Sequence, residues 1–322
     1  MNREYKAAIV GVKNLKGKTL KETLEKLKIN FRDFRLYEPG IGEYALFDSF
    51  RDEAMVVMNP RPENLKGLDI VFFTVPVEDE LFFAPTVSVD LSGSRRDLPP
   101  VVSGINDENV ESDRIFNPPP GVIALSHLIY PLGKLVEYGF SILIEPASER
   151  GEKAMDELFS QAINLLNMEE VPQKELGEVL AFDLLPKGGK KGKGKFTREE
   201  LEIAEGLKTI TGINEFYTMI LRSGIFHRYS TILFLKLNKD IPLKKLGEML
   251  SNHKYLLIEE EKLSPSKFRE EEGFYIHLSD IRKGEGGKYW MWAVFDNLKR
   301  GSVFNAIEAG IKILNRKNEV IN

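Results

Sequence analysis

The sequence has no cysteine among its 322 residues. This absence excludes disulfide bonds, thiolate zinc sites, iron–sulfur clusters and every reaction that uses a cysteine nucleophile. It is typical of a reducing compartment or of a thermophile that avoids labile residues. Long apolar runs are also absent, because no stretch approaches the roughly 18 apolar residues of a membrane-spanning helix. The first apolar run, residues 7–10, is too short for a signal peptide. We therefore expect a cytoplasmic protein with no membrane partner.

An excess of positive charge is missing as well. The 45 lysines and arginines are outnumbered by 49 aspartates and glutamates, which gives a formal net charge of -4. A protein without a basic field is not expected to bind nucleic acid. The four histidines form no HExxH or HxH pattern, so we expect no metal site. A GxSxG motif, the signature of a serine nucleophile on a sharp turn, is also absent.

The first third of the chain alternates strand-like and helix-like patterns. Leu20, Leu24 and Leu27 recur at helical spacing between short apolar runs. Strands are predicted over residues 5–10, 33–37, 55–58, 70–75 and 88–91. This alternation predicts a parallel sheet with crossover connections. The length is sufficient for two domains.

The segment Asn117-Pro118-Pro119-Pro120 interrupts the pattern, since proline does not extend a strand or helix interior. Beyond it, strands are predicted over residues 140–144, 229–237 and 289–295, and helices over residues 151–166, 199–210, 244–250 and 301–314. Residues 187–195, KGGKKGKGK, are of low complexity. They are interpreted either as an anion-binding loop or as a solvated surface insertion.

Gly11, Asn14 and Gly17 lie where the first predicted strand meets the first predicted helix. Glycines at such a turn let the backbone approach a pyrophosphate at the positive end of the helix. The middle position carries Asn14, whose side chain enters the phosphate space. Two readings stay open, a dinucleotide site and a strand–helix turn that no longer binds one. A P-loop is not expected, because Gly11 lies one residue too far upstream of Gly17.

Polar residues also follow later strand ends. Ser148 and its neighbours come after the strand at 140–144, where α/β folds gather ligands. Ser148 is equally interpreted as the N-cap of the next helix. His227 lies between Arg222 and Arg228, where an imidazole could act in catalysis or bind an anion. His127, in an apolar helix, is predicted to be a core residue.

Several segments, in order, resemble the aspartate-semialdehyde dehydrogenase family. They are the Gly11–Gly17 turn, residues 89–93 (VDLSG), 101–106 (VVSGIN), 117–120 (NPPP), 179–186 (VLAFDLLP), 280–282 (DIR) and 296–301 (DNLKRG) with Asn305 and Ala306. The resemblance implies an α/β protein with a Rossmann-type dinucleotide-binding domain, residues 1–128 and 297–322. It also implies an α+β dimerisation domain with a mixed sheet, residues 129–296, and a homodimer.

The resemblance further implies NADP or NAD as cofactor and no metal. Glu38 favours a free ribose 2′-hydroxyl, whereas Arg35 suits a 2′-phosphate, so the choice between the two stays open. The cofactor-binding candidates are Gly11, Asn14, Gly17, Ser92, Gly93 and Asn297.

Three positions depart from the family's chemistry. A thiolate attacks the aldehyde in that family and forms a thioester, but the cysteine position is Pro120 here. The histidine position is Tyr229, and the glutamine position is Glu145. Arg222 matches the arginine that binds the substrate carboxylate, and His227 is a second substrate-binding candidate. The sequence Ala147–Gly151, ASERG, resembles a divergent subgroup without the active-site cysteine.

These departures predict a homologue without the thioester-forming dehydrogenase activity, one that retains nucleotide or small-carboxylate binding. Two alternatives remain. One is an enzyme, either an NAD(P)-dependent oxidoreductase acting on an aldehyde of amino-acid biosynthesis or a new activity that uses Arg222, Tyr229 and Glu145. The other is a regulatory partner of an active dehydrogenase.

Overall fold

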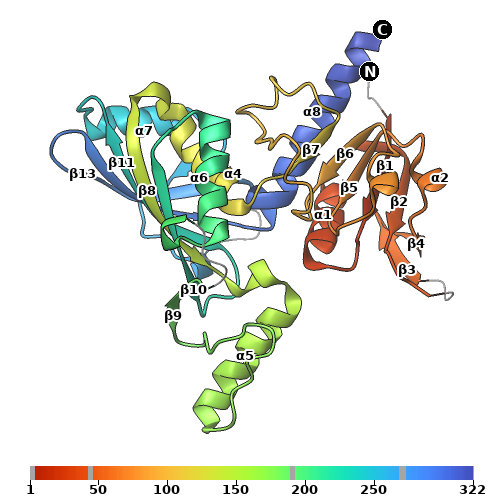
Figure 1. The fold of residues 1–322 in the computed structure, drawn as a ribbon, viewed down its shortest axis with the longest axis horizontal. Helices are drawn as coiled ribbons and strands as arrows, with labels where there is room; N and C mark the ends of the chain where they lie inside the picture. The colour runs from red at the N-terminus through yellow and green to blue at the C-terminus, as the bar shows by residue number, and fades with distance from the viewer. Residues whose placement is uncertain (1–3, 43–45, 189–192, 268–272, 322) are drawn as a thin grey trace. The chain divides into compact units, whose positions relative to one another are not determined.

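The computed structural model describes residues 4–42, 46–188, 193–267 and 273–321 (Figure 1). The chain divides into two compact units. Unit 1 comprises residues 1–118 and 302–322, and unit 2 comprises residues 119–301. The division falls before helix α4 (Pro120–Ile129), because α4 packs against other helices of unit 2. Our domain limits at residues 128 and 297 remain predictions.

Unit 1 is built on a seven-stranded sheet. Its elements are β1 (Glu4–Val10), α1 (Leu15–Lys26), β2 (Asn30–Tyr37), β3 (Leu46–Phe50), β4 (Glu53–Met58), α2 (Pro62–Leu65), β5 (Ile70–Phe73), α3 (Asp79–Phe82), β6 (Val87–Asp90), β7 (Arg114–Phe116) and α8 (Phe304–Ile321). The strand order is β3-β4-β2-β1-β5-β6-β7, and all neighbours are parallel except β3 and β4. The predicted parallel sheet with crossovers is confirmed, with an antiparallel edge strand added.

Helices cover both faces of this sheet. Apolar residues of α1 and α8, such as Leu20 and Ile307, pack on the face that carries Ile9 and Phe72. The short helices α2 and α3 cover the opposite face, which carries Val10 and Phe73. These strands are buried on both faces, which explains why they read as continuous apolar runs rather than as alternating patterns.

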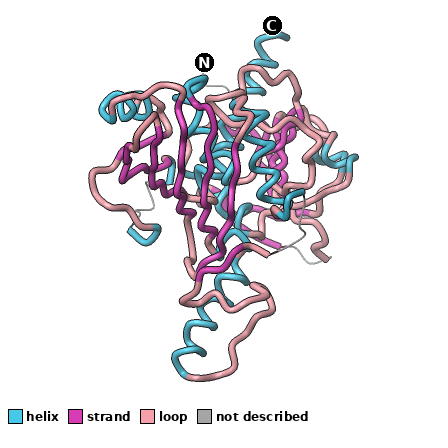
Figure 2. Tube along the Cα trace, turned by 60° about the vertical axis from the view of Figure 1, so that its left-hand side comes forward, coloured by secondary structure: helices cyan, strands magenta, loops and turns pink. Residues whose placement is uncertain are grey.

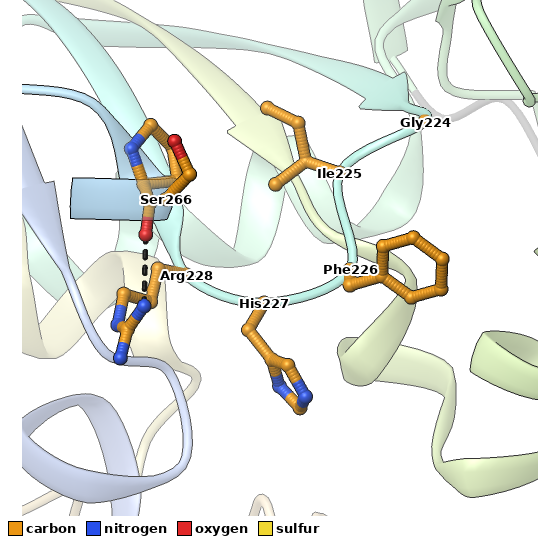
Figure 3. A pocket seen from close by; sticks show the side chains of 7 residues that line it. Gly224, Ile225, Phe226, His227, Arg228 and Ser266 are labelled. Carbon is orange, nitrogen blue, oxygen red and sulfur yellow. Dashed lines mark hydrogen bonds between the residues drawn. The ribbon is translucent and has the colours of Figure 1, made fainter. Parts of the chain in front are cut away.

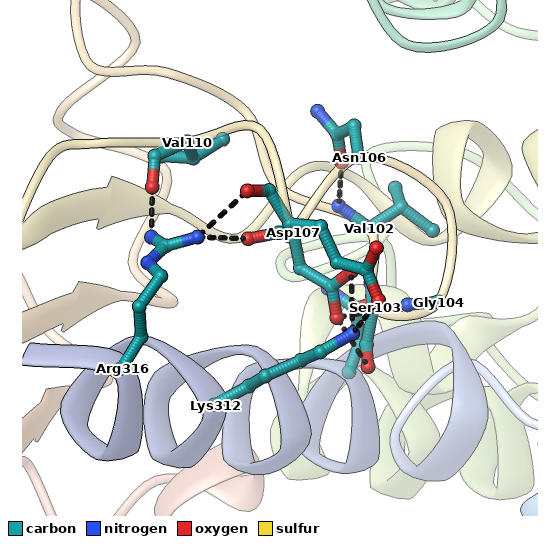
Figure 4. A network of polar contacts seen from close by, with 10 residues as sticks. Val102, Ser103, Gly104, Asn106, Asp107, Val110, Lys312 and Arg316 are labelled. Atoms are coloured by element: carbon teal, nitrogen blue, oxygen red, sulfur yellow. Dashed lines mark hydrogen bonds and ion pairs between the residues drawn. The ribbon is translucent and has the colours of Figure 1, made fainter. Parts of the chain in front are cut away.

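Polar contacts also hold helix α8 to the rest of unit 1 (Figure 4). Asn305 accepts a hydrogen bond from the Ser103 backbone N–H at 2.8 Å and donates to Asn117. Lys312 contacts the buried carboxylate of Asp107 at 3.2 Å. Arg316 donates to the carbonyl oxygens of Asp107, Glu108 and Val110. The C-terminal helix is therefore an integral part of the first unit.

Unit 2 is built on a second seven-stranded sheet. Its elements are α4, β8 (Val136–Glu145), α5 (Glu152–Asn167), β9 (Leu184–Pro186), α6 (Arg198–Thr211), β10 (Phe216–Ser223), β11 (Tyr229–Leu237), α7 (Leu243–Ser251), β12 (Leu256–Ile258), β13 (Ile276–Lys283) and β14 (Lys288–Phe295). The order is β12-β13-β14-β11-β8-β10-β9. The sheet is mixed, because β8 is parallel to β10 and antiparallel to β11.

The two faces of the second sheet differ. One face packs under helices, where Leu143 of β8 meets Gly121 of α4. The other face carries an aromatic cluster in which the Phe234 ring lies 4.9 Å from Phe140 and 4.7 Å from Trp290. Long strands of this sheet run side by side in Figure 2. Because Trp290 is 40% exposed, this face has apolar surface that no described residue of unit 2 covers.

Helix α5 projects beyond the end of the second sheet (Figures 1 and 2). The chain after it folds back along the helix, where the buried Gln161 side chain bonds to the backbone at residues 172, 178, 180 and 181. Of the segment at 179–186, which resembles the family, only Leu184–Pro186 forms a strand, paired with β10. Among the described residues, no helix is long and apolar enough to cross a membrane.

Candidate functional site

The turn after β1 requires both of its glycines for packing. Gly11 has φ +94°, and a Cβ there would lie 2.5 Å from the Thr74 hydroxyl oxygen. A Cβ on Gly17 would lie 2.1 Å from the carbonyl oxygen of Gly11. No side chain fits either position, so helix α1 approaches β1 closely because of these two residues.

Asn14 is the N-cap of α1, and its side chain is fully engaged. Its Oδ1 accepts from the backbone N–H of Gly17 at 2.9 Å. Its Nδ2 donates to the Thr74 hydroxyl at 2.9 Å and to the Thr74 carbonyl at 3.2 Å. The Thr74 hydroxyl in turn donates to the Gly11 carbonyl at 2.6 Å. We call Asn14, Gly17 and Thr74 the Asn14 network.

Other cofactor-binding candidates of unit 1 lie at a nearby strand end. Ser92 donates through its backbone N–H and its hydroxyl to Asp90 Oδ1, at 2.8 and 2.5 Å. Gly93 follows with φ +79°, and no atom lies within 4 Å of the place that a Cβ would take. The Lys16 ammonium group, from α1, contacts the Leu91 carbonyl at 3.3 Å. The sheet therefore gathers Gly11, Asn14, Gly17, Ser92 and Gly93 at one edge, whereas Asn297 belongs to unit 2.

In unit 2, a buried charged cluster lies at the end of β8. The Glu145 carboxylate, 3% exposed, accepts from the Lys187 ammonium at 2.5 Å and from the Tyr229 hydroxyl at 3.1 Å. Burial raises the pKa of Tyr229 well above its usual value, and the charges of Glu149 and Glu145 raise it further. We call Glu145, Lys187 and Tyr229 the Glu145 cluster. In it, both acidic and phenolic side chains are satisfied by the protein itself.

Lys187 was missed by sequence reasoning. It begins the low-complexity run at 187–195, of which residues 189–192 lie outside the described residues. Its place is fixed by strand β9, because the Lys187 backbone N–H donates to the Ile220 carbonyl of β10 at 2.8 Å. A run of lysines and glycines is typical of a solvated loop, so its first member gave no sign of pairing with a buried carboxylate.

Asn297 links the loops around the Glu145 cluster. Its Oδ1 accepts from the Ser148 hydroxyl at 3.2 Å and from the Arg228 backbone N–H at 3.3 Å. Its Nδ2 donates to Glu149 at 3.2 Å. The prediction that Ser148 caps a helix is wrong, because α5 begins at Glu152 with Gly151 as its N-cap.

Arg222 is buried at the end of β10. Its guanidinium donates to the Leu176 carbonyl at 2.7 Å and lies 3.4 Å from a Glu178 carboxylate oxygen. Burial lowers the pKa of Arg222, and the nearby charge of Arg150 lowers it further. The guanidinium thus anchors the chain that follows α5. The role of Arg222 in substrate binding stays a prediction.

His227 lies in a cavity of about 440 Å³ whose lining includes Phe226, Arg228 and Ser266 (Figure 3). Arg228 adopts φ +72°, a strained conformation for a residue with a side chain. Its guanidinium donates to the Pro265 carbonyl at 2.8 Å and lies 3.8 Å from Asp296. Desolvation lowers the pKa of His227. A small acid entering this cavity would meet an imidazole and a guanidinium.

Two further predicted positions, Pro120 and His127, are buried in helix α4. Pro120 is buried in the first turn of α4, and a Cβ on Gly301 would lie 3.0 Å from its Cβ. His127 is fully buried and shares a 2.9 Å hydrogen bond with His253, as expected for a core histidine. Burial lowers the pKa of His253 to about 4. No group of ligands suited to a metal occurs within the described ranges.

Comparison with known proteins agrees with this architecture. Residues 144–300 match the family described as semialdehyde dehydrogenase, dimerisation domain. The aspartate-semialdehyde dehydrogenase of Bacillus subtilis (strain 168) is 22% identical over 339 residues, covering 96% of this chain and 97% of the relative. A USG-1 protein homolog of Azotobacter vinelandii is 24% identical, covering 94% and 95%.

Solved structures share the fold over almost the whole chain. Aspartate semialdehyde dehydrogenase II from Vibrio cholerae gives a TM-score of 0.87 at 19% identity, covering 98% of this chain and 99% of the other. A probable aspartate-semialdehyde dehydrogenase from Pseudomonas aeruginosa gives 0.88 at 18% identity, covering 98% and 100%. Residues 144–300 are therefore similar to the semialdehyde dehydrogenase dimerisation domain, and the whole chain is similar in sequence and fold to aspartate-semialdehyde dehydrogenases.

Proposed function

We propose that this chain is a homodimeric homologue that does not perform the family's thioester-forming dehydrogenase reaction and that binds a small carboxylate in unit 2. One observation carries the proposal. The three positions that would supply thiol, amide and imidazole are Pro120, Glu145 and Tyr229, and the latter two are buried and bonded to each other. Since the chain contains no cysteine, no other residue can supply the thiolate.

The Glu145 cluster also argues against new chemistry at the same place. A general acid or base must reach the substrate within hydrogen-bond distance. Glu145 is already bound by Lys187, Tyr229 is only 5% exposed, and the cavity shown in Figure 3 is lined by neither. The raised pKa of Tyr229 keeps its phenol protonated, so it serves as a donor to Glu145. These contacts support a structural role for the cluster.

The ligand part of the proposal rests on the cavity beside His227. Arg228 brings a permanent positive charge to the cavity wall, 3.8 Å from the Asp296 carboxylate, and a positive charge in a cavity attracts a carboxylate ligand. The apolar surface of Ile225 and Phe226 suits a short carbon chain. We expect small dicarboxylic or amino acids to raise the melting temperature, since a ligand that binds only the folded state must do so. Arg228→Gln should abolish that rise.

The homodimer rests on the open face of the second sheet. Large apolar side chains are exposed there: Tyr217 (54%) and Met219 (45%) on β10, and Trp290 (40%) on β14. A large exposed apolar patch of this kind is typical of a surface that binds another protein. This face lies within the segment that matches a dimerisation domain. Light scattering after gel filtration should give twice the chain mass, and Trp290→Glu should shift it toward the monomer.

The missing activity has a direct test. Purified protein, aspartate semialdehyde, phosphate and NADP should give no growth of NADPH absorbance, whereas a cysteine-containing relative assayed in parallel should. Pro120→Cys alone should stay inactive, because the imidazole and amide positions remain Tyr229 and Glu145. Sustained turnover by the wild-type protein would overturn the proposal.

A further inference from the structure

The first turn of a helix exposes backbone N–H groups that anions bind, and dinucleotide sites use this at a strand–turn–helix junction. A glycine in the middle of the turn lets the pyrophosphate approach the backbone. NADP or NAD is the group that the fold of unit 1 implies. Whether the residues of unit 1 fit this group depends on what already lies at the N-terminus of α1.

The Asn14 side chain lies at that position. Its Oδ1 caps α1 through the Gly17 N–H, which removes one of the donors that a phosphate would use. The same amide donates twice to Thr74 at the end of β5. Moving Asn14 aside for a ligand would therefore break three hydrogen bonds within the Asn14 network at once.

Glu38 removes a second donor. This residue follows β2, and its Oε2 accepts from the backbone N–H of Lys13 at 2.8 Å, within the same turn. The backbone N–H groups of Gly11 and Val12 are bound to the Tyr37 carbonyl, at 2.8 and 3.3 Å. A carboxylate this close to the turn also repels a pyrophosphate, since like charges disfavour each other.

We infer that unit 1 is closed to dinucleotides, because the Asn14 side chain lies where a pyrophosphate would approach the turn and Glu38 takes up the Lys13 N–H of the same turn. The glycines have a structural reason: at positions 11 and 17 a side chain would collide with Thr74 and with the backbone. The turn is thus a structural joint between α1 and the sheet. This inference concerns unit 1 and is independent of the chemistry proposed for unit 2.

The test is binding of NAD and of NADP to the full chain, followed by thermal shift and by calorimetry. The wild-type protein should show no saturable shift with either. Asn14→Gly/Glu38→Gln removes the amide and the charge together, and it should bind at least one of the two saturably, with a dissociation constant at least about tenfold below the highest concentration at which wild type shows no binding. Asn14→Gly alone should retain folding, because glycine costs an N-cap only a few tenths of a kcal/mol.

Asn106→Gly is the matched control. Asn106 also bonds to backbone within unit 1, to Val102 N–H and the Pro100 carbonyl, but away from the turn. It should lose some stability and gain no binding. Saturable binding by the wild-type chain would overturn the inference, and so would failure of both Asn14 variants to gain any. Neither result depends on turnover, so failure here is distinguishable from failure of the proposed function.

Discussion

The Asn14 network and the Glu145 cluster lie at strand ends in different units, and they are built from different chemistry. The Asn14 network joins an amide, a hydroxyl and backbone groups, all neutral. The Glu145 cluster joins a carboxylate, an ammonium and a phenol, with Glu145 only 3% exposed. A neutral network depends on shape, whereas a buried charged cluster depends on keeping its partners together. We therefore expect changes of side-chain volume to destabilise the turn around the Asn14 network, and changes of charge to destabilise the Glu145 cluster.

The largest effect is expected from Gly17→Ala, which tests the shape of the turn. The added Cβ would lie 2.1 Å from the Gly11 carbonyl oxygen, and backbone cannot move aside as a side chain can. We expect a loss of about 3 kcal/mol or more in the free energy of unfolding, at the upper end for overpacking. Urea unfolding followed by far-ultraviolet circular dichroism measures it.

Gly247→Ala is the control for that change. Gly247 lies inside α7, where the nearest atom to a new Cβ is 3.8 Å away. Alanine there should leave stability unchanged or raise it, because it is the better helix former. Equal losses in the free energy of unfolding at both positions would show that the close contact at Gly17 is not the cause of the destabilisation.

Lys187→Met comes next and tests charge pairing in the Glu145 cluster. It leaves a buried carboxylate without its cation, and we expect about 2 kcal/mol, below the usual range for a buried pair because Lys187 is 13% exposed. Both tryptophans lie on β14, so their fluorescence reports unit 2 alone. Lys187→Met/Glu145→Gln should recover most of the loss, and no recovery would contradict the pairing.

A third prediction concerns alkaline pH. Tyr229 has a raised pKa in the folded state, whereas in the unfolded chain a tyrosine titrates at about 10. The unfolded chain therefore loses its proton first, so this contribution is present below pH 10 and is lost as the pH rises beyond it. Tyr229→Phe should flatten that decline and cost about 1.5 kcal/mol at neutral pH through the lost hydrogen bond to a charged group.

Tyr130→Phe serves as the comparison, because Tyr130 is 45% exposed. It should leave both the alkaline decline and the neutral stability close to those of the wild-type chain. An alkaline profile of Tyr229→Phe that superimposes on wild type would show that the phenol does not sense its buried surroundings.

The smallest effect is expected from Asn14→Ala. Loss of the cap should cost about 1 kcal/mol. Because none of the three members of the Asn14 network titrates near neutral pH, the loss should be the same at pH 6 and at pH 8, as measured by urea unfolding. A strongly pH-dependent loss would break the contrast with the Glu145 cluster.

Most of the fold could be predicted because it follows from local patterns. Strand β11 was predicted with its exact limits, residues 229–237, and the apolar runs of unit 1 became the inner strands of its sheet. Strands β3 and β10 were not predicted. Each has exposed apolar residues, such as Phe47 and Tyr217, which blur the alternation that sequence reasoning depends on.

The candidate sites were less accessible to sequence reasoning, since partners there come from distant segments. Asn14 was identified as intruding on the phosphate space, but Thr74 and Glu38, which hold the turn, lie 60 and 24 residues later. Glu145 was known only as a departure from the resemblance. Its pairing with Lys187 depends on strand β9, which is three residues long and edge-paired. Hydrogen bonds of this kind are specified by tertiary pairing rather than by periodicity.

The contribution of α8 to unit 1 has a consequence for how the chain is made. Residues 302–322 complete a core that begins in residues 1–118. Within this core, Ile70 and Val89 pack against Gly310 and neighbouring residues of α8. A ribosome delivers all of residues 119–301 before that covering helix exists. Unit 1 is therefore the first to be synthesised and the last to complete its core. Until α8 has been made, the apolar surface that it covers is exposed, and such surface is prone to aggregation and is a target of chaperones.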